Sequence, residues 1–187
     1  MFIDKTLYKG RPESTGGRQE KELRCYELLD SLGMEYYRAD HEHADTIEVC
    51  HEVEKVVGSE ICKNLFLTNR QQTEFYLLMM PGDKPFKTKI LSKEIGTARL
   101  SFGTPEHMEM LLGLSPGSVT VLGLMNDREN RVKLLIDRDL LKDRWISGHP
   151  CISTSTIKMK TAEVTEKLLP ALGHEPQYVD LPWNTED

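Results

Sequence analysis

Residues 61–80 read ICKNLFLTNRQQTEFYLLMM, with two apolar runs on either side of a polar turn. This pattern is typical of a β-hairpin inside a protein core, because short apolar runs broken by polar turn residues pair as neighbouring strands. Lys63 stands where the first buried run begins and is followed directly by Asn64. The two residues are either exposed polar side chains at a sheet edge or part of the lining of a pocket.

The segments around this hairpin predict short helices interleaved with further strands. Cap residues and glycine stops predict helices at 19–31, 46–58, 88–96, 104–113 and 161–173. Strands are expected at 34–38, 98–102, 119–125, 132–137, 151–159 and 177–181. Strict βαβ alternation is absent, so the fold class is α+β, or irregular α/β, with a mixed, largely antiparallel central sheet surrounded by short helices.

Length and composition indicate one globular domain. The chain has 187 residues, of which 39% are hydrophobic and 29% charged. No repeat or linker divides it, and we expect one domain over 1–187 with 1–18 as an N-terminal arm. No apolar run reaches the ~20 residues of a membrane span, and the first residues do not have the pattern of a secretory signal. We therefore expect a cytoplasmic protein.

The four cysteines do not predict a metal site. Cys25, Cys50, Cys62 and Cys151 are scattered, and small buried hydrophobic residues in a reducing compartment are the expected interpretation. A site of Cys50, His51 and Cys62 matches none of the usual zinc spacings. Cys62 as a nucleophile activated by a neighbouring cation is an alternative, but adjacent strand residues point in opposite directions.

A basic cluster stands out against the acidic total. The formal net charge of −6 argues against a protein that coats nucleic acid, since such proteins usually carry a basic domain. The segment 84–99 is nevertheless rich in lysine, which is either a solvated surface or a local binding site for phosphates. The candidates for backbone contacts are Lys84, Lys87, Lys89 and Lys93.

Lys63 is the first candidate for chemistry. It is either a lysine that extends to solvent or a cation fixed on a core strand beside an anion or a polarised carbonyl. Asn64 adds an amide donor and acceptor, but the two side chains cannot share one face of a regular strand.

The segment SGHPCISTST at 147–156 is the second candidate. Gly148 and Pro150 bracket His149 in an irregular turn, where a histidine can face a cleft, although an exposed turn is the plainer interpretation. The serines and threonines after it either hydrogen-bond a ribose or phosphate or simply form a strand. Gly117 and Gly123 allow a ligand to approach the backbone.

Six blocks occur along the chain in a specific order. They are HADT near Thr46, KNLFL at 63–67, RLSF at 99–102, LLGLSPGSVTVLGL at 111–124, LLID at 134–137 and GHP at 148–150. Together they resemble the prolyl-tRNA synthetase-associated (YbaK-type) editing domains, which clear mischarged aminoacyl-tRNA. The free-standing subgroup that acts on alanyl-tRNA(Pro) in trans is the most similar, because no synthetase domain is attached.

This resemblance implies a deacylase that needs no cofactor and no metal. Lys63 matches the family lysine that faces the aminoacyl pocket and is needed for deacylation, and His149 matches a residue at the amino-acid end. The same cleft is implied to be lined by Thr46, Asn64, Gly123, Ser153 and Thr154. The implied partner is mischarged tRNA(Pro), held by its CCA end and acceptor stem, with a transient contact to prolyl-tRNA synthetase.

The preferred amino acid stays open at this level. Family members often carry asparagine where this chain has Ser153, which bears on ribose contacts and substrate preference. A cysteinyl-tRNA(Pro) deacylase is one alternative, and a non-catalytic module that binds tRNA or an amino acid is another. The presence of Lys63 favours the enzyme. Monomer and dimer are both compatible with the sequence, which shows no coiled-coil seam.

Overall fold

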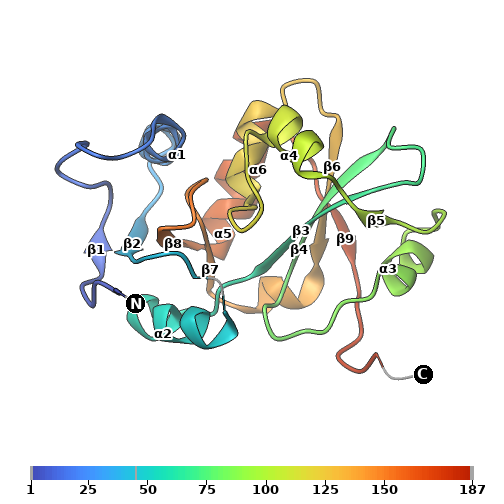
Figure 1. The fold of residues 1–187 in the computed structure, drawn as a ribbon, viewed down its shortest axis with the longest axis horizontal. Coiled ribbons are helices and arrows are strands. Elements are labelled where there is room, and N and C mark those ends of the chain that lie inside the picture. The colour runs from blue at the N-terminus through green and yellow to red at the C-terminus, as the bar shows by residue number, and fades with distance from the viewer. Residues whose placement is uncertain (1, 45, 186–187) are drawn as a thin grey trace.

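The computed structural model describes residues 2–44 and 46–185, and its strands form two sheets (Figure 1). The four-stranded sheet has the order β1 (Tyr8–Lys9), β2 (Tyr36–Asp40), β8 (Ser155–Lys160) and β7 (Trp145–Gly148). The five-stranded sheet has the order β5 (Ser101–Phe102), β3 (Lys63–Thr68), β4 (Phe75–Met80), β6 (Val132–Asp137) and β9 (Gln177–Val179). The α+β class with mixed, largely antiparallel pairing is confirmed, and the strands are divided between two sheets.

Short helices surround both sheets. They are α1 (Glu20–Ser31), α2 (Ile47–Val57), α3 (Thr88–Glu94), α4 (Pro105–Leu112), η1 (Val121–Asn126), η2 (Arg138–Lys142), α5 (Thr161–Glu163), η3 (Val164–Leu168) and α6 (Leu169–Leu172). In the described part of the chain, none of them has the length and apolarity that crossing a membrane requires.

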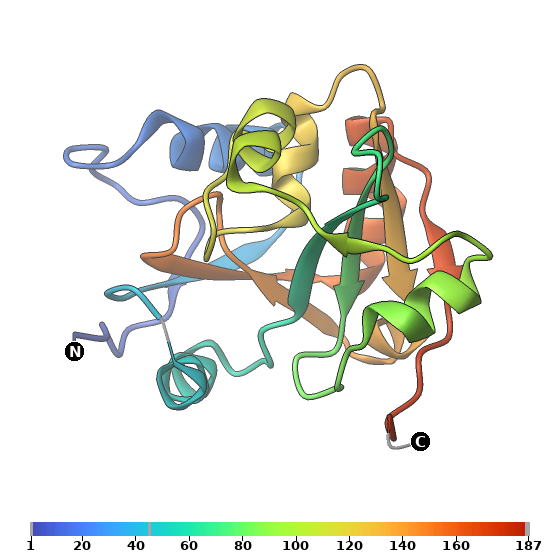
Figure 2. The ribbon, with the colours of Figure 1, turned by 45° about the vertical axis from the view of Figure 1, so that its right-hand side comes forward.

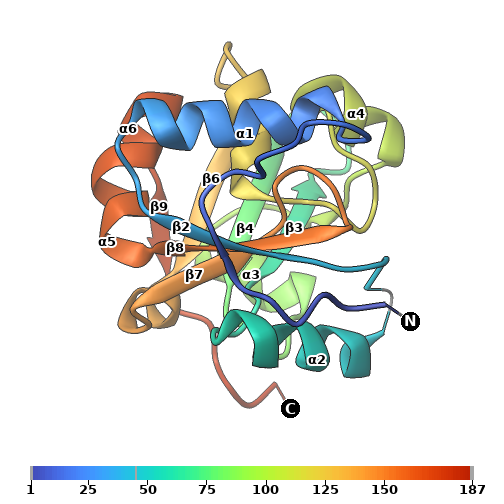
Figure 3. The same cartoon turned by 90° about the vertical axis from the view of Figure 1, so that its left-hand side faces the viewer.

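The four-stranded sheet is antiparallel throughout and is covered on both faces. Helix α1 packs on one face, where Tyr26 stacks on Tyr36 with ring centroids 5.8 Å apart. Helix α2 covers the other face, where Val53 packs in a small cluster with Ala39. Figure 3 shows the two helices on opposite sides of this sheet.

The predicted hairpin is confirmed in the five-stranded sheet. β3 and β4 pair antiparallel, with Lys63 opposite Met80, whereas β4–β6 and β6–β9 are parallel. Every residue of β4 is buried, because Leu77 and Met79 face the main core while Leu78 and Met80 face a second cluster beneath α3. Figure 2 shows α3 beside this sheet.

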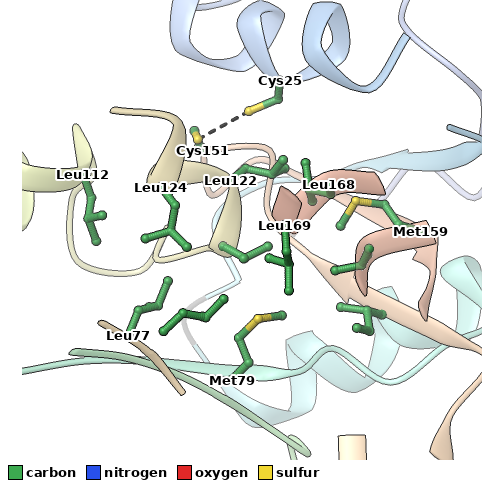
Figure 4. Packing of buried hydrophobic residues seen from close by; sticks show 14 of the residues in the cluster. Cys25, Leu77, Met79, Leu112, Leu122, Leu124, Cys151, Met159, Leu168 and Leu169 are labelled. Atoms are coloured by element: carbon green, nitrogen blue, oxygen red, sulfur yellow. Dashed lines mark hydrogen bonds between the residues drawn. The ribbon is translucent and has the colours of Figure 1, made fainter. Parts of the chain in front are cut away.

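The main core joins the two sheets (Figure 4). Met79 of β4, Met159 of β8 and Leu122 of η1 all contribute to it. Cys25 and Cys151 lie in the same cluster, with their sulfur atoms 3.4 Å apart. The four cysteines are free thiols, three of them buried, as expected for small hydrophobic residues.

Two helices begin and end as their cap residues predict. Thr46 accepts a hydrogen bond from Val49 N–H at the start of α2, and Gly58 ends that helix in the left-handed conformation. Thr104 caps α4 in the same way, and Gly113 ends it. A side-chain acceptor at the N-cap and a glycine at positive φ satisfy backbone groups that the helix leaves unpaired.

One expected strand is absent, and others are shorter than expected or shifted along the chain. Residues 119–125 contain no strand, because Thr120 caps the 3₁₀ helix η1, in which Val121, Leu122 and Leu124 are buried. An apolar run of this length cannot distinguish a buried strand from a buried helix by its periodicity. β8 begins at Ser155 instead of residue 151, since Cys151 adopts φ +62° and turns the chain.

The N-terminal arm is docked on the four-stranded sheet. Within the described residues of the arm, Tyr8 pairs with Arg38 as an edge strand, and Ile3 forms a bridge with His41. Arg18 then makes ion pairs with Glu22 and Asp40. The arm therefore adds a strand to the sheet before α1 begins.

Candidate active site

The two sheets meet at the start of β3. Ile61 forms a parallel bridge with Ser147, and Cys62 N–H donates to the Ser147 carbonyl at 3.0 Å. This contact brings Lys63 and Asn64 next to the end of β7, which leads directly into His149. The two sequence blocks that carry the strongest candidates, KNLFL and GHP, thus lie at one junction.

Lys63 is half-buried at this junction. Its Nζ donates to the Lys84 carbonyl at 2.6 Å. Burial lowers the pKa of Lys63, while the nearby carboxylates of Asp83 and Glu60 act in the opposite direction. The structure therefore places a positive charge on a core strand, at a loop that also carries negative charge.

Asn64 points to the other face of β3, as the alternation of strand side chains requires. Its Nδ2 donates to the carbonyl and the sulfur of Cys62, each at 3.3 Å. Its Oδ1 is buried and has no hydrogen-bond partner among the described residues. An unpaired buried acceptor costs about 1–3 kcal/mol, so a ligand that donates to this oxygen would recover that energy.

His149 is half-buried beside a second histidine. Its Nδ1 donates to the Ser155 carbonyl at 2.8 Å, and its ring lies 6.2 Å from that of His41. Burial lowers the pKa of His149, and His41 adds to the effect. Because a carbonyl only accepts, the proton is on Nδ1, and Nε2 of the neutral ring is an acceptor.

A small cavity of about 310 Å³ lies over the loop that follows His149. Ser153 and Thr154 line it together with His43 and the turn at 115–118. The Ser153 hydroxyl is hydrogen-bonded to His43 Nδ1, and the Thr154 carbonyl accepts from His41 N–H. A wider hollow of about 600 Å³ between α1 and α6 contains none of the predicted residues.

Thr46 and Gly123 have structural roles in the fold. The Thr46 hydroxyl caps α2, and Asp45 beside it in the HADT block lies outside the described residues. At Gly123, a Cβ would lie 2.6 Å from Leu114 Cδ1, so packing by itself accounts for the glycine. Its lack of a side chain allows η1 to pack on the segment that follows α4, and no ligand is needed to explain it.

The predicted basic cluster needs a correction. Lys84 is fully buried, and its Nζ donates to Asp137, Asp139 and the Leu181 carbonyl, each at 2.7 Å. A lysine held in this way cannot reach a phosphate. The other three lysines of the predicted cluster are exposed, with Lys87 just before α3 and Lys89 and Lys93 on it. Of the four candidates, only these three can contact a phosphate.

Cys62 is a poor nucleophile in this structure. Complete burial raises the pKa of its thiol to about 12, so the thiolate is scarce at neutral pH. Among residues 2–44 and 46–185, no group of three or more His, Cys, Asp or Glu side chains is arranged to hold a metal ion.

The sequence did not predict that Thr120, Gly148 and Asn64 lie close together. Thr120 is buried at the cap of η1, and a Cβ on Gly148 would lie 3.9 Å from both Thr120 Oγ1 and Asn64 Nδ2. The glycine in GHP was the only local sign that other side chains lie close to the backbone at this position. Thr120 carried no such signal, because its segment was expected to be a strand.

Comparisons with known proteins define the class. Residues 41–167 match the family described as "Aminoacyl-tRNA editing domain". The chain is 28% identical over 153 residues to "Prolyl-tRNA editing protein ProX" of Acetoanaerobium sticklandii, covering 82% of this chain and 93% of that protein. It is 26% identical over 164 residues to "Prolyl-tRNA synthetase associated domain-containing protein 1" of Xenopus laevis, covering 86% and 95%.

A solved structure shares the fold. A crystal structure described as a candidate trans-editing enzyme for prolyl tRNA synthetase superposes with a TM-score of 0.64 at 18% identity, covering 88% of this chain and 99% of the other. This protein is therefore a hydrolase that acts on aminoacyl-tRNA. It belongs to the family of aminoacyl-tRNA editing domains, and the resemblance seen in its sequence blocks is confirmed.

Proposed function

We propose that the chain is a trans-editing deacylase that hydrolyses alanyl-tRNA(Pro), acting as a single domain over 1–187 in the cytoplasm. The buried Oδ1 of Asn64 carries this proposal, because it is an acceptor without a partner among the described residues, and it belongs to the residue that follows Lys63 at the start of β3. An aminoacyl ester brings the two complementary groups, an α-ammonium donor and a carbonyl that gains negative charge. The two relatives named for prolyl-tRNA support tRNA(Pro) as the carrier.

The proposed reaction needs only water as a second reactant. The α-ammonium donates to Asn64 Oδ1. The long side chain of Lys63, at the first residue of β3, leaves the Lys84 carbonyl and turns towards the face of Asn64, where its ammonium stabilises negative charge at the ester. Water adds to the ester carbonyl carbon, and the bond from that carbon to the ribose oxygen breaks. The ribose oxygen takes a proton, which leaves a free amino acid and an intact tRNA 3′ end.

The remaining predicted residues are assigned around this centre. His149 lies at the amino-acid end as a neutral ring, with Ser153 and Thr154 at the ribose end beside the cavity. Thr46 lies at the start of α2, next to Asp45 of the HADT block. Exposed lysines of α3 contact the acceptor stem, and prolyl-tRNA synthetase meets the enzyme transiently when mischarged tRNA is handed over.

Deacylation of alanyl-, cysteinyl-, seryl- and prolyl-tRNA(Pro) by the wild type and by Lys63→Ala tests this proposal. We expect rapid loss of the alanyl ester, and a decrease of about 100-fold or more in Lys63→Ala, because a single donor to developing negative charge contributes an effect of this size. Lys55→Ala is the matched control. Lys55 is an exposed lysine of α2 whose Nζ donates to Glu52 at 2.6 Å, and it has no assigned contact with tRNA or the aminoacyl group.

Each outcome has a distinct meaning. Preference for the cysteinyl ester would keep the enzyme and change its substrate. Turnover that is unaffected by Lys63→Ala would contradict the role of Lys63. Binding of tRNA without turnover of any ester would leave a non-catalytic module.

A further inference from the structure

Gly148 is a buried glycine at the end of β7 that the fold itself does not require. Its φ lies outside the left-handed region, so an L-residue can adopt the same backbone conformation. An ideal Cβ there would have Asn64 Nδ2 and Thr120 Oγ1 as its nearest neighbours, both at 3.9 Å. That distance is an ordinary van der Waals contact. Neither backbone strain nor packing explains the missing side chain.

The other glycines of the chain differ in this respect. Eight of the thirteen have positive φ, where glycine is favoured. At Gly82, Gly103 and Gly123, a Cβ would lie 2.3–2.6 Å from a neighbouring atom, so packing demands glycine. Gly16 is exposed in the N-terminal arm. Gly148 is thus the one buried glycine in the described chain that leaves space a side chain could fill.

The walls of this space are polar and firmly held. Asn64 is fixed by its bonds to Cys62, and its Oδ1 has no partner in the described structure. Thr120 is 2% exposed, and its hydroxyl caps η1 by accepting from Leu122 N–H at 3.4 Å. A group placed beside the Gly148 Cα would therefore lie against the Thr120 hydroxyl and against the Asn64 amide, which also carries the unpaired Oδ1.

We propose that Gly148 is a specificity-determining residue that leaves room for the β-carbon of the aminoacyl group. This inference rests on the proposed function, in which the α-ammonium donates to Asn64 Oδ1. With the ammonium at Asn64, the amino acid's β-carbon occupies the space beside the Gly148 Cα. A Cβ at residue 148 would already be in ordinary contact with Asn64 and Thr120, so these two side chains limit the space. We expect the space to admit glycyl and alanyl groups and to exclude a longer side chain or a proline ring.

Gly148→Ala tests this, because it places a methyl group of the protein in the space assigned to the substrate's β-carbon. In the variant, the new methyl fills the space, so we expect kcat/KM for alanyl-tRNA(Pro) to fall roughly tenfold or more. Glycyl-tRNA(Pro), charged chemically, has no β-carbon. Because the new methyl group fills only the β-carbon site, kcat/KM for this substrate should stay within about twofold of the wild-type value. Gly16→Ala is the matched control, with the same chemical change at an exposed site.

A measurement on the wild type keeps the inference testable even if the variant misfolds. The wild type should cleave the 2-aminobutyryl ester, which has one more carbon, at least about tenfold more slowly than the alanyl ester. Equal rates for these two esters would overturn the inference, as would an unchanged alanyl-to-glycyl ratio in folded Gly148→Ala. A wild type that cleaves none of the esters would contradict the proposed function instead.

Discussion

His149 is held in a way that makes its protonation unfavourable. Its Nδ1 donates to Ser155, the ring is half-buried, and the His41 ring lies 6.2 Å away between centroids. Burial and that neighbour lower the pKa of His149 below its usual value of 6.5. The half-buried histidine therefore stays neutral in part of the pH range where an exposed one takes up a proton.

This shift predicts a loss of stability in acid. Below pH 6.5 the unfolded chain binds a proton that folded His149 does not, so the free energy of unfolding should fall as pH drops from 6.5 towards the lowered pKa. Above pH 6.5 the contribution should be constant. His149→Asn, whose amide can still donate to Ser155, should weaken this dependence when urea denaturation is compared at about pH 7.5 and 5.5, on either side of the usual histidine pKa.

His41 serves as an internal reference for this experiment. The pKa of His41 is also lowered by burial, and its contribution remains in both proteins. The difference between wild type and variant therefore reports on His149 together with its electrostatic interaction with His41. Identical pH dependence in the two proteins would mean that His149 is not held neutral.

At the level of elements, the exposed side of α3 carries lysines that a ligand can reach, whereas Lys84 before the helix is buried. Lys89 and Lys93 are one helical turn apart and exposed, whereas Leu91 on the opposite side packs into the cluster against the five-stranded sheet. The amphipathic pattern thus fixes which lysines are available to a ligand. Lys84 precedes the helix and does not share this pattern.

Charge reversal on α3 should weaken tRNA binding. For Lys89→Glu with Lys93→Glu, we expect a higher Kd for tRNA(Pro) and a slope of log K against log salt that is reduced by about 1–2, because each lost phosphate contact contributes about 0.7–0.9 to that slope. Lys5→Glu with Lys9→Glu, on exposed positions of the N-terminal arm, gives the same change in net charge. Equal effects from both pairs would show a general charge effect rather than an α3 contact.

At the level of the whole molecule, Lys84 connects distant segments. Its buried ammonium joins Asp137 at the end of β6, Asp139 in η2 and the carbonyl of Leu181 near the end of the described chain. Its own carbonyl accepts the bond from Lys63. One residue therefore ties the C-terminal segment and the η2 turn to the loop that holds Lys63.

Removing this charge should be strongly destabilising. Lys84→Met would leave Asp137, which is 1% exposed, as a buried carboxylate without its cation, and we expect a loss of about 3–5 kcal/mol in the free energy of unfolding. Lys87→Met, at an exposed lysine, should stay within about 0.5 kcal/mol. Urea denaturation measures both, and a small loss for Lys84→Met would mean that the Asp137 carboxylate is stabilised by other groups.

Local signals in the sequence determined much of this fold. The hairpin of β3 and β4, the caps of α2 and α4, and the opposite orientations of Lys63 and Asn64 follow from hydrophobic runs, cap residues and strand alternation. These features depend on neighbours only a few residues away. The order of the sequence blocks was equally sufficient to indicate the family.

Contacts between distant residues decided the rest. Lys84 is buried because Asp137, Asp139 and Leu181 surround it, and no local pattern distinguishes it from Lys87. Thr120 and Gly148 meet Asn64 only because the two sheets join at the bridge between Ile61 and Ser147. Burial and side-chain convergence depend on how the sheets pack, so the candidate site became complete only in the tertiary structure.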